Sequence, residues 1–158
     1  MRKRIQVSAI VLVLAISSAC IHKAGGARAT AYEKAVTYST MLAQVNNSIA
    51  QGVIQAQQLG QLSVPQTNAI LGFQERVARD HKQLSILLGD GPDAAKGNAA
   101  AITIVLADVK AQATALIGSG DLGIKNPVSQ QTFAGDANSL VDLASSVVSY
   151  LQAAGVVQ

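Results

Sequence analysis

The sequence predicts an all-α fold, an antiparallel four-helix bundle made of two helical hairpins. Along four segments, apolar residues recur at alternating spacings of three and four, which is the period of packed helices. Glycine and proline gather between these segments, and the alternating apolar–polar runs of strands are absent. We expect the bundle to occupy residues 28–158, after an N-terminal signal or anchor segment (1–19) and a short flexible tether (20–27).

The first predicted helix begins near Arg28 and ends at Gly60, which we expect to adopt a left-handed cap with Leu62 packing back on the helix. Ser63 is a good N-cap for the second helix, because its hydroxyl can accept a hydrogen bond from the first turn, and Pro65 is tolerated there. The apolar stripe predicted for the first helix is Ala35, Tyr38, Leu42, Val45, Ile49, Gly52, Ala56 and Leu59.

The second predicted helix runs to Leu88 and ends at the GDGP turn of residues 89–92. Asp80 falls on its apolar stripe, or His81 does if the register shifts. The other members of this stripe are Ile70, Phe73, Val77, Leu84 and Leu87.

The third predicted helix opens at Pro92 or Asp93, and Gly97 weakens its first turns. Its apolar face is Ile102, Val105, Val109, Ala113 and Leu116. A loop over residues 118–126 leads to Asn126 as N-cap and Pro127 as the first residue of the fourth helix.

The fourth predicted helix ends at Gly155, and we expect residues 156–158 to form a frayed tail. Its apolar stripe is Phe133, Ala137, Leu140, Ala144, Val147, Leu151 and Ala154.

The basic balance of the chain comes from its first residues. The whole sequence has 12 Lys and Arg against 9 Asp and Glu, and Arg2, Lys3 and Arg4 account for the excess. From Cys20 onward the side-chain charge is therefore zero, and only five aromatic residues occur in the chain. These features predict no nucleic-acid partner, since neither a basic surface nor a stacking platform is indicated.

The first 20 residues have the pattern of an export signal: a basic start, an apolar run from Ile5 to Ile16, and then small residues. The sequence Ser17-Ser18-Ala19-Cys20 resembles the lipobox of bacterial lipoproteins. That resemblance implies cleavage before Cys20, a diacylglycerol thioether on its sulfur, and acylation of its amino group with a fatty acid such as palmitate. Ile21 in place of Asp implies sorting to the outer membrane.

Two other interpretations of this segment stay open. The small residues before Cys20 also suit ordinary secretory cleavage, which would release a soluble protein. Alternatively, the apolar run stays uncleaved as a membrane anchor, although it is shorter than the roughly 20 residues of a membrane-spanning helix.

No catalytic, cofactor or metal site is expected. The chain has two glutamates and two histidines, His22 and His81, and lacks Glu-x-x-His and Gly-x-Ser-x-Gly motifs. Met41 is expected to be a packing residue. We therefore predict a protein that is not an enzyme.

One polar cluster in the second helix is a candidate site: Glu75, Arg76, Arg79, Asp80, His81 and Lys82. It admits two interpretations. Glu75 with Arg79 and Arg76 with Asp80 have the i,i+4 spacing of weak helical ion pairs on a solvated face. Alternatively, the cluster is a partner-docking patch formed by Glu75, Arg76, Arg79, Asp80 and Lys82 on a surface otherwise poor in charge.

The resulting expectation is a cell-envelope lipoprotein, held to the membrane by lipid on Cys20. Its bundle would serve as a structural or protein-interaction module, with an envelope protein or a second copy as partner. Two alternatives remain open: a carrier that binds a small apolar ligand or lipid inside the bundle, and an inner-membrane accessory protein with an uncleaved anchor.

Overall fold

The computed structural model describes residues 29–118 and 127–158, with side chains in the second range described from Gln130 onward, and these residues are helical apart from short connections. The prediction of an all-α fold is confirmed. The signal segment, Cys20, the tether and the loop containing Asn126 lie outside the described residues. The helices are α1 (Ala31–Gln58), α2 (Val64–Leu88), α3 (Pro92–Gly97), α4 (Ala99–Gly118) and α5 (Pro127–Ala153).

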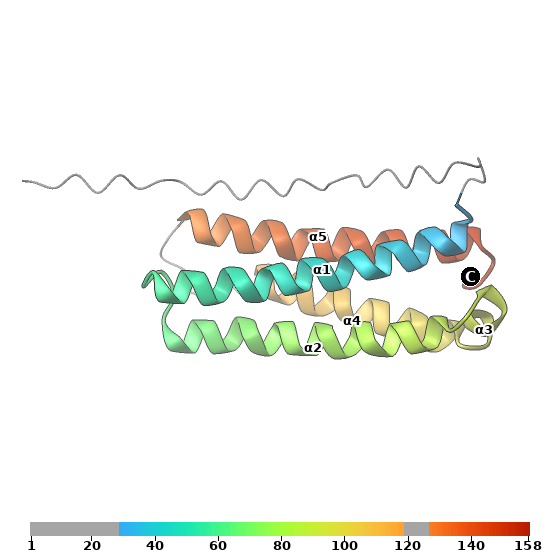
Figure 1. Ribbon diagram of the computed structural model, residues 1–158, viewed down its shortest axis with the longest axis horizontal. Helices are drawn as coiled ribbons and strands as arrows, with labels where there is room; N and C mark the ends of the chain where they lie inside the picture. The colour runs from blue at the N-terminus through green and yellow to red at the C-terminus, as the bar shows by residue number, and fades with distance from the viewer. Residues whose placement is uncertain (1–28, 119–126) are drawn as a thin grey trace, which may run out of the picture.

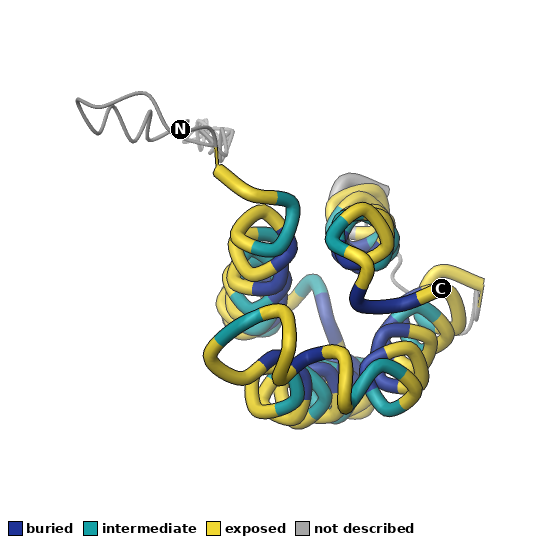
Figure 2. The backbone as a smooth tube through the Cα atoms, turned by 90° about the vertical axis from the view of Figure 1, so that its right-hand side faces the viewer, coloured by how far each residue is buried: buried dark blue, intermediate teal, exposed yellow. Residues whose placement is uncertain are grey.

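The four long helices lie side by side, and each runs opposite to the long helix before it (Figure 1). α1 packs against α2 and α5, and α4 packs against the same two helices from the other side. Seen along the bundle, the buried side of each long helix faces the common interior (Figure 2). The short helix α3 lies at the end of the bundle where α2 gives way to α4.

Local chemistry explains where the helices begin and end. Ser63 caps α2 in a reciprocal box with Gln66, and Thr30 does the same for α1 with Glu33. Gly60 has a φ of 70°, the left-handed conformation that glycine adopts without a Cβ clash. The N–H of Gln61 then donates to the carbonyl of Ala56 at 2.9 Å, which closes the predicted cap, and Leu62 is buried against the core.

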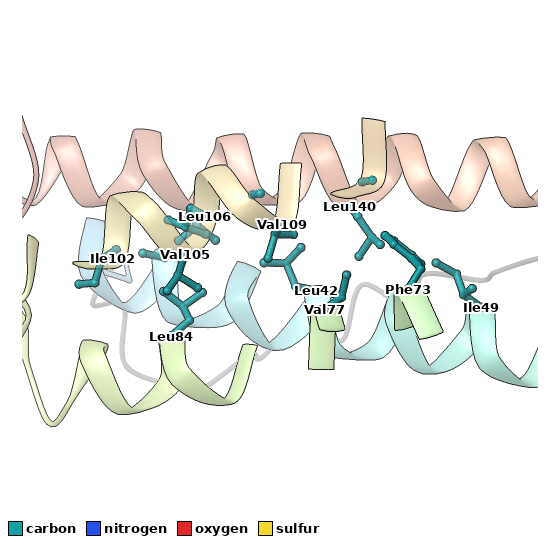
Figure 3. Packing of buried hydrophobic residues seen from close by; sticks show 14 of the residues in the cluster. Leu42, Ile49, Phe73, Val77, Leu84, Ile102, Val105, Leu106, Val109 and Leu140 are labelled. Carbon is teal, nitrogen blue, oxygen red and sulfur yellow. The ribbon is translucent and has the colours of Figure 1, made fainter. Parts of the chain in front are cut away.

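One apolar core runs the length of the bundle, and all four long helices contribute to it. Side chains such as Leu42, Val77, Val109 and Leu140 point toward one another across the interior (Figure 3). The largest fully buried side chains are Leu42, Ile49, Ile70, Leu84, Ile102, Leu106, Leu140, Leu151, Val53, Val77, Val109 and Val147.

The predicted stripe of α1 is partly wrong. Leu59 is 72% exposed, whereas Ser39, Asn46 and Val53, each one position beyond a predicted residue, are buried. The reason is that α1 packs against two neighbours, so its buried face is wider than a single heptad stripe. Leu59 belongs to the turn after α1 and points into solvent.

Three further expectations need correction. Leu88 is buried at the end of α2, while Leu87 is only half-buried. The predicted third helix is two helices, because the chain breaks at Asn98, whose side-chain amide donates to the carbonyl of Leu87 at 3.0 Å. The expected frayed tail is packed instead.

The packed tail follows from the cap at Gly155, whose φ of 66° turns the chain back. The N–H of Val156 donates to the carbonyl of Leu151 at 2.9 Å, and both Val156 and Val157 are buried in the core. This arrangement is the same glycine cap that ends α1.

Among the described helices, α4 alone has the length and apolar composition that a membrane-spanning helix requires. Five of its residues nevertheless form part of the bundle core, which gives a core helix the same composition. Its outward side carries Ile104, which is 61% exposed.

Candidate functional site

The candidate site is the outward side of α2. Arg76, Arg79 and Lys82 are all exposed there, at successive spacings of three residues, and Glu75 is exposed beside them. We call the three cations the basic row. Because three residues are slightly less than one helical turn, the row crosses the outer side of α2 obliquely.

Asp80, the remaining residue of the predicted docking patch, lies apart from the basic row. It is half-buried at the contact with α4, where its Oδ2 accepts a hydrogen bond of 2.6 Å from Nε2 of Gln112. The carboxylate of Asp80 therefore faces a neighbouring helix. The spacing of residues within α2 could not predict Gln112 as its partner. The exposed part of the patch is consequently three cations and one acid.

The ion pairs suggested by i,i+4 spacing are absent. Within residues 29–118 and 127–158 the single ion pair joins Lys96 to Asp93 at 3.7 Å, on the short helix α3. No intramolecular hydrogen bond engages the side-chain nitrogens of Arg76, Arg79 or Lys82 in that part of the chain. The basic row is therefore free to meet an external anion.

Charge is unevenly divided over the described surface. α2 carries three cations and two acids, one of which is Asp80. The rest of the described residues carry three cations, Lys34, Lys96 and Lys110, against six acids. The cations of the described residues are thus concentrated on α2, whereas acids predominate on the rest of the described surface.

Behind the basic row, the contact between α1 and α2 is lined by polar groups, which sequence analysis did not identify. Tyr32 Oη donates to the carbonyl of Leu88 at 2.8 Å, and Asn46 Nδ2 donates to the carbonyl of Gln74 at 2.9 Å. Between them, the imidazole of His81 interacts with the backbone of Ser39.

These three contacts recur every seven residues: positions 32, 39 and 46 of α1 oppose positions 88, 81 and 74 of α2. We call this contact the polar seam. The sequence does contain a signal for the polar seam: polar residues that repeat every seven positions beside an apolar stripe.

Burial is the main cause of shifted pKa values at three groups in the bundle, His81, Asp136 and Tyr32. It lowers the pKa of His81 below the usual value for histidine, and the interaction with the Ser39 backbone opposes this only in part. Burial also raises the pKa of Asp136, which lies half-buried on α5. For Tyr32, burial and the nearby charge of Asp90 raise the pKa, so its hydroxyl stays a donor at neutral pH.

The contact between α1 and α5 has a different character. Tyr38 and Tyr150 stack at a tilt, with ring centroids 5.2 Å apart, and the ammonium of Lys34 lies 5.6 Å from the centroid of the Tyr150 ring. The interaction with the Tyr150 side chain is the main cause of the raised pKa of Tyr38. Further along, Gly52 lies beside the ring of Phe133.

Residues considered for metal or haem chemistry are not brought together. Among the described residues no three His, Cys, Asp or Glu side chains are grouped as metal ligands would be. Met41 is half-buried on α1. Cys20 and His22 lie outside the described residues, so the predicted lipid attachment at Cys20 stays a prediction.

Comparison with known proteins adds no relative: no protein-family model, no curated protein and no solved structure matches this chain.

Proposed function

We propose that this protein is a lipid-anchored component of the bacterial cell envelope, with a helical bundle that serves as an interaction module rather than as an enzyme. In this proposal Cys20 carries the lipid, and the outer membrane is the favoured location. The outward side of α2 is the docking surface.

A docking surface is supported most directly by the lack, among the described residues, of intramolecular hydrogen bonds and ion pairs at the basic row. Isolated helical ion pairs contribute only a few tenths of a kcal/mol, so three unpaired cations say little about stability. They do provide a surface that attracts and orients an acidic partner. Asp80 would weaken that attraction if it faced outward, and its hydrogen bond to Gln112 keeps it away.

The anchoring part of the proposal is supported by the lipobox-like sequence. A lipoprotein cleaved before Cys20 would carry several acyl chains. Since each buried CH₂ contributes about 0.8 kcal/mol, and one chain alone binds marginally, multiple chains give stable anchoring.

The mass of the N-terminal peptide tests the anchor. The full chain is expressed in a bacterium, and the peptide is recovered from the membrane fraction. We expect a peptide that starts at Cys20 and carries added diacylglycerol and acyl mass. A peptide that starts at Met1 would show an uncleaved anchor, and an unmodified Cys20 start in the soluble fraction would show a secreted protein; either outcome rejects the lipoprotein.

Capture of envelope components tests the docking surface. Arg76→Ala with Arg79→Ala should abolish recovery of a component that the unaltered chain retains. A matched variant, Lys34→Ala with Lys110→Ala, removes the same charge from α1 and α4 and should leave recovery unchanged. If the first pair of substitutions leaves all recovered components in place, the basic row is not a docking surface.

A further inference from the structure

We infer that the basic row docks on anionic lipid headgroups of the same membrane that holds the anchor, so that the bundle lies with α2 against the bilayer surface. This inference rests on the proposed anchoring and assigns the docking surface its partner. Three features of the molecule lead to it: the position of the row relative to the tether, the neighbouring exposed isoleucine, and the distribution of the remaining charge.

The basic row lies near the end of the bundle where the tether joins. α1 begins beside the end of α2, because Tyr32 donates a hydrogen bond to the carbonyl of Leu88. Lys82, Arg79 and Arg76 precede Leu88 by 6, 9 and 12 residues, which places them about 9, 14 and 18 Å from that end at 1.5 Å per residue.

The length of chain between Cys20 and the bundle allows this contact. Thr30 follows Cys20 by ten positions, and a segment of this length reaches at most about 33–36 Å when fully extended. Every member of the basic row is closer to the anchored end than this limit. A lipid on Cys20 would therefore hold the row within reach of the headgroups.

Ile86 adds an apolar contact on the same side of α2. It follows Arg79 by seven residues, so the two side chains share one side of the helix, and it is 70% exposed. Cations beside an exposed aliphatic side chain are the combination that binds the boundary between headgroups and acyl chains.

The rest of the molecule favours the same orientation. Beyond α2 the described residues carry six acids and three cations, and four of these acids lie on α1, α4 and α5, which a negatively charged surface repels; Asp90 and Asp93 follow α2 directly. An anionic leaflet would thus turn the bundle until α2 faces it. Because the mature chain is neutral overall, this effect depends on where the charges lie and not on their sum.

The strength expected of the basic row explains why a tether is needed. A Lys or Arg near an anionic surface contributes about fivefold in affinity, so three contribute about 100-fold, and the exposed carboxylate of Glu75 beside them reduces this gain. That is too little to hold a free protein on a membrane. It is enough to change the orientation of a protein already tethered there, because the tether makes the contact intramolecular.

The test supplies the anchor chemically. Residues 20–158 contain every described residue, and Cys20 is the only cysteine, so its thiol can be coupled to a maleimide lipid in vesicles. The chain has no tryptophan, which allows Ile86→Trp to report on the docking side by energy transfer to a dansyl lipid. Ile104→Trp, on the outward side of α4, is the matched reporter. Circular dichroism first checks that each variant keeps its helices.

We expect strong energy transfer from the Ile86→Trp reporter on vesicles with 30% phosphatidylglycerol, and weak transfer on phosphatidylcholine alone or in 0.5 M salt. Arg76→Gln, Arg79→Gln and Lys82→Gln together should reduce the docking equilibrium constant about 100-fold. Lys34→Gln, Lys96→Gln and Lys110→Gln together change the net charge equally and should preserve transfer.

Equal transfer on both vesicle types would overturn the inference, as would an equal loss in the two triple variants. Capture of an envelope protein by the basic row, without any effect of phosphatidylglycerol, would also overturn it and assign the surface to a protein. Because the vesicle experiment does not depend on natural acylation, failure of the anchor in cells and failure of lipid docking remain distinguishable.

Discussion

The two contacts made by α1 are built on different chemistry. Toward α5 it packs aliphatic and aromatic side chains, including the Tyr38–Tyr150 pair. Toward α2 it has the polar seam, which includes Ser39 and Asn46, two of the three buried polar residues of the described chain. The third, Thr67, lies on α2 seven residues before Gln74. The difference indicates that the α1–α5 contact supplies stability, whereas the polar seam specifies how α1 and α2 align.

The reason lies in how the two kinds of contact depend on position. Apolar burial is non-directional, so an aliphatic contact tolerates a small shift of one helix along the other. A hydrogen bond requires a donor and acceptor at fixed separation, and a buried polar group left unpaired costs roughly 1–3 kcal/mol. Misalignment of the polar seam therefore costs more free energy than its correct alignment contributes to the association of α1 and α2.

The largest loss of stability should follow a substitution in the apolar core. Leu140→Ala removes a fully buried side chain of α5, and we expect the free energy of unfolding to fall by about 3 kcal/mol because a cavity remains. Urea denaturation measures the change. Ile104→Ala on the exposed side of α4 is the control and should stay within about 0.5 kcal/mol of the unaltered chain.

A smaller loss is expected at the polar seam. Asn46→Ala deletes the hydrogen bond to Gln74, and we expect a fall of about 1 kcal/mol in the free energy of unfolding. The adjacent exposed residue provides the control, since Asn47→Ala removes the same group without a buried partner. A loss as large as that of Leu140→Ala would contradict the assignment of the seam to alignment rather than stability.

Removing a buried polar group that has no partner should instead raise the free energy of unfolding. The Oγ1 of Thr67 is buried without a hydrogen-bond partner in the described structure. Thr67→Val keeps the shape and removes the hydroxyl, so we expect the free energy of unfolding to rise by about 1 kcal/mol. Thr114→Val on the exposed side of α4 should be neutral. A decrease at position 67 would mean that the hydroxyl has a partner in solution.

The smallest effect concerns pH. The folded pKa of His81 lies below its unfolded value near 6.5, so the unfolded chain binds more protons between these two values. Stability is therefore lost as pH falls through 6.5 toward the folded pKa, and it is fully present above 6.5. Urea midpoints at pH 7.5 and 5.5 should differ less for His81→Gln than for the unaltered chain. An equal difference would show that other groups cause it.

Local chemistry made most of the helix boundaries predictable. Gly60, Ser63, Pro127 and Gly155 mark the ends of helices in the structure as their backbone preferences require. Such signals act within a few residues of the chain, and for that reason a single sequence contains them. The all-α class followed from the same signals together with the apolar period.

What the sequence left undetermined depends on contacts between distant segments. In the sequence, Asn46 is a polar residue next to the predicted apolar stripe of the first helix. It is a buried hydrogen-bond donor only because α2 packs against it. Asp80 reads as a helical ion-pair partner of Arg76, until α4 brings Gln112 to it. For the candidate site, the sequence placed all of its charged residues on one helix. Only the tertiary structure showed which of these side chains lack an intramolecular partner within the described part of the chain.

The heptad repeat of the polar seam limits how the α1–α2 hairpin can slide. A slip by a single helical turn moves each donor three or four residues along its partner, about 5 Å, and separates all three contacts at once. Because the three contacts share one seven-residue repeat, a slip of one helix along the other breaks them together rather than one after another. A pull along the axis of α1 should therefore meet one threshold, at which the three contacts break, rather than a series of small steps.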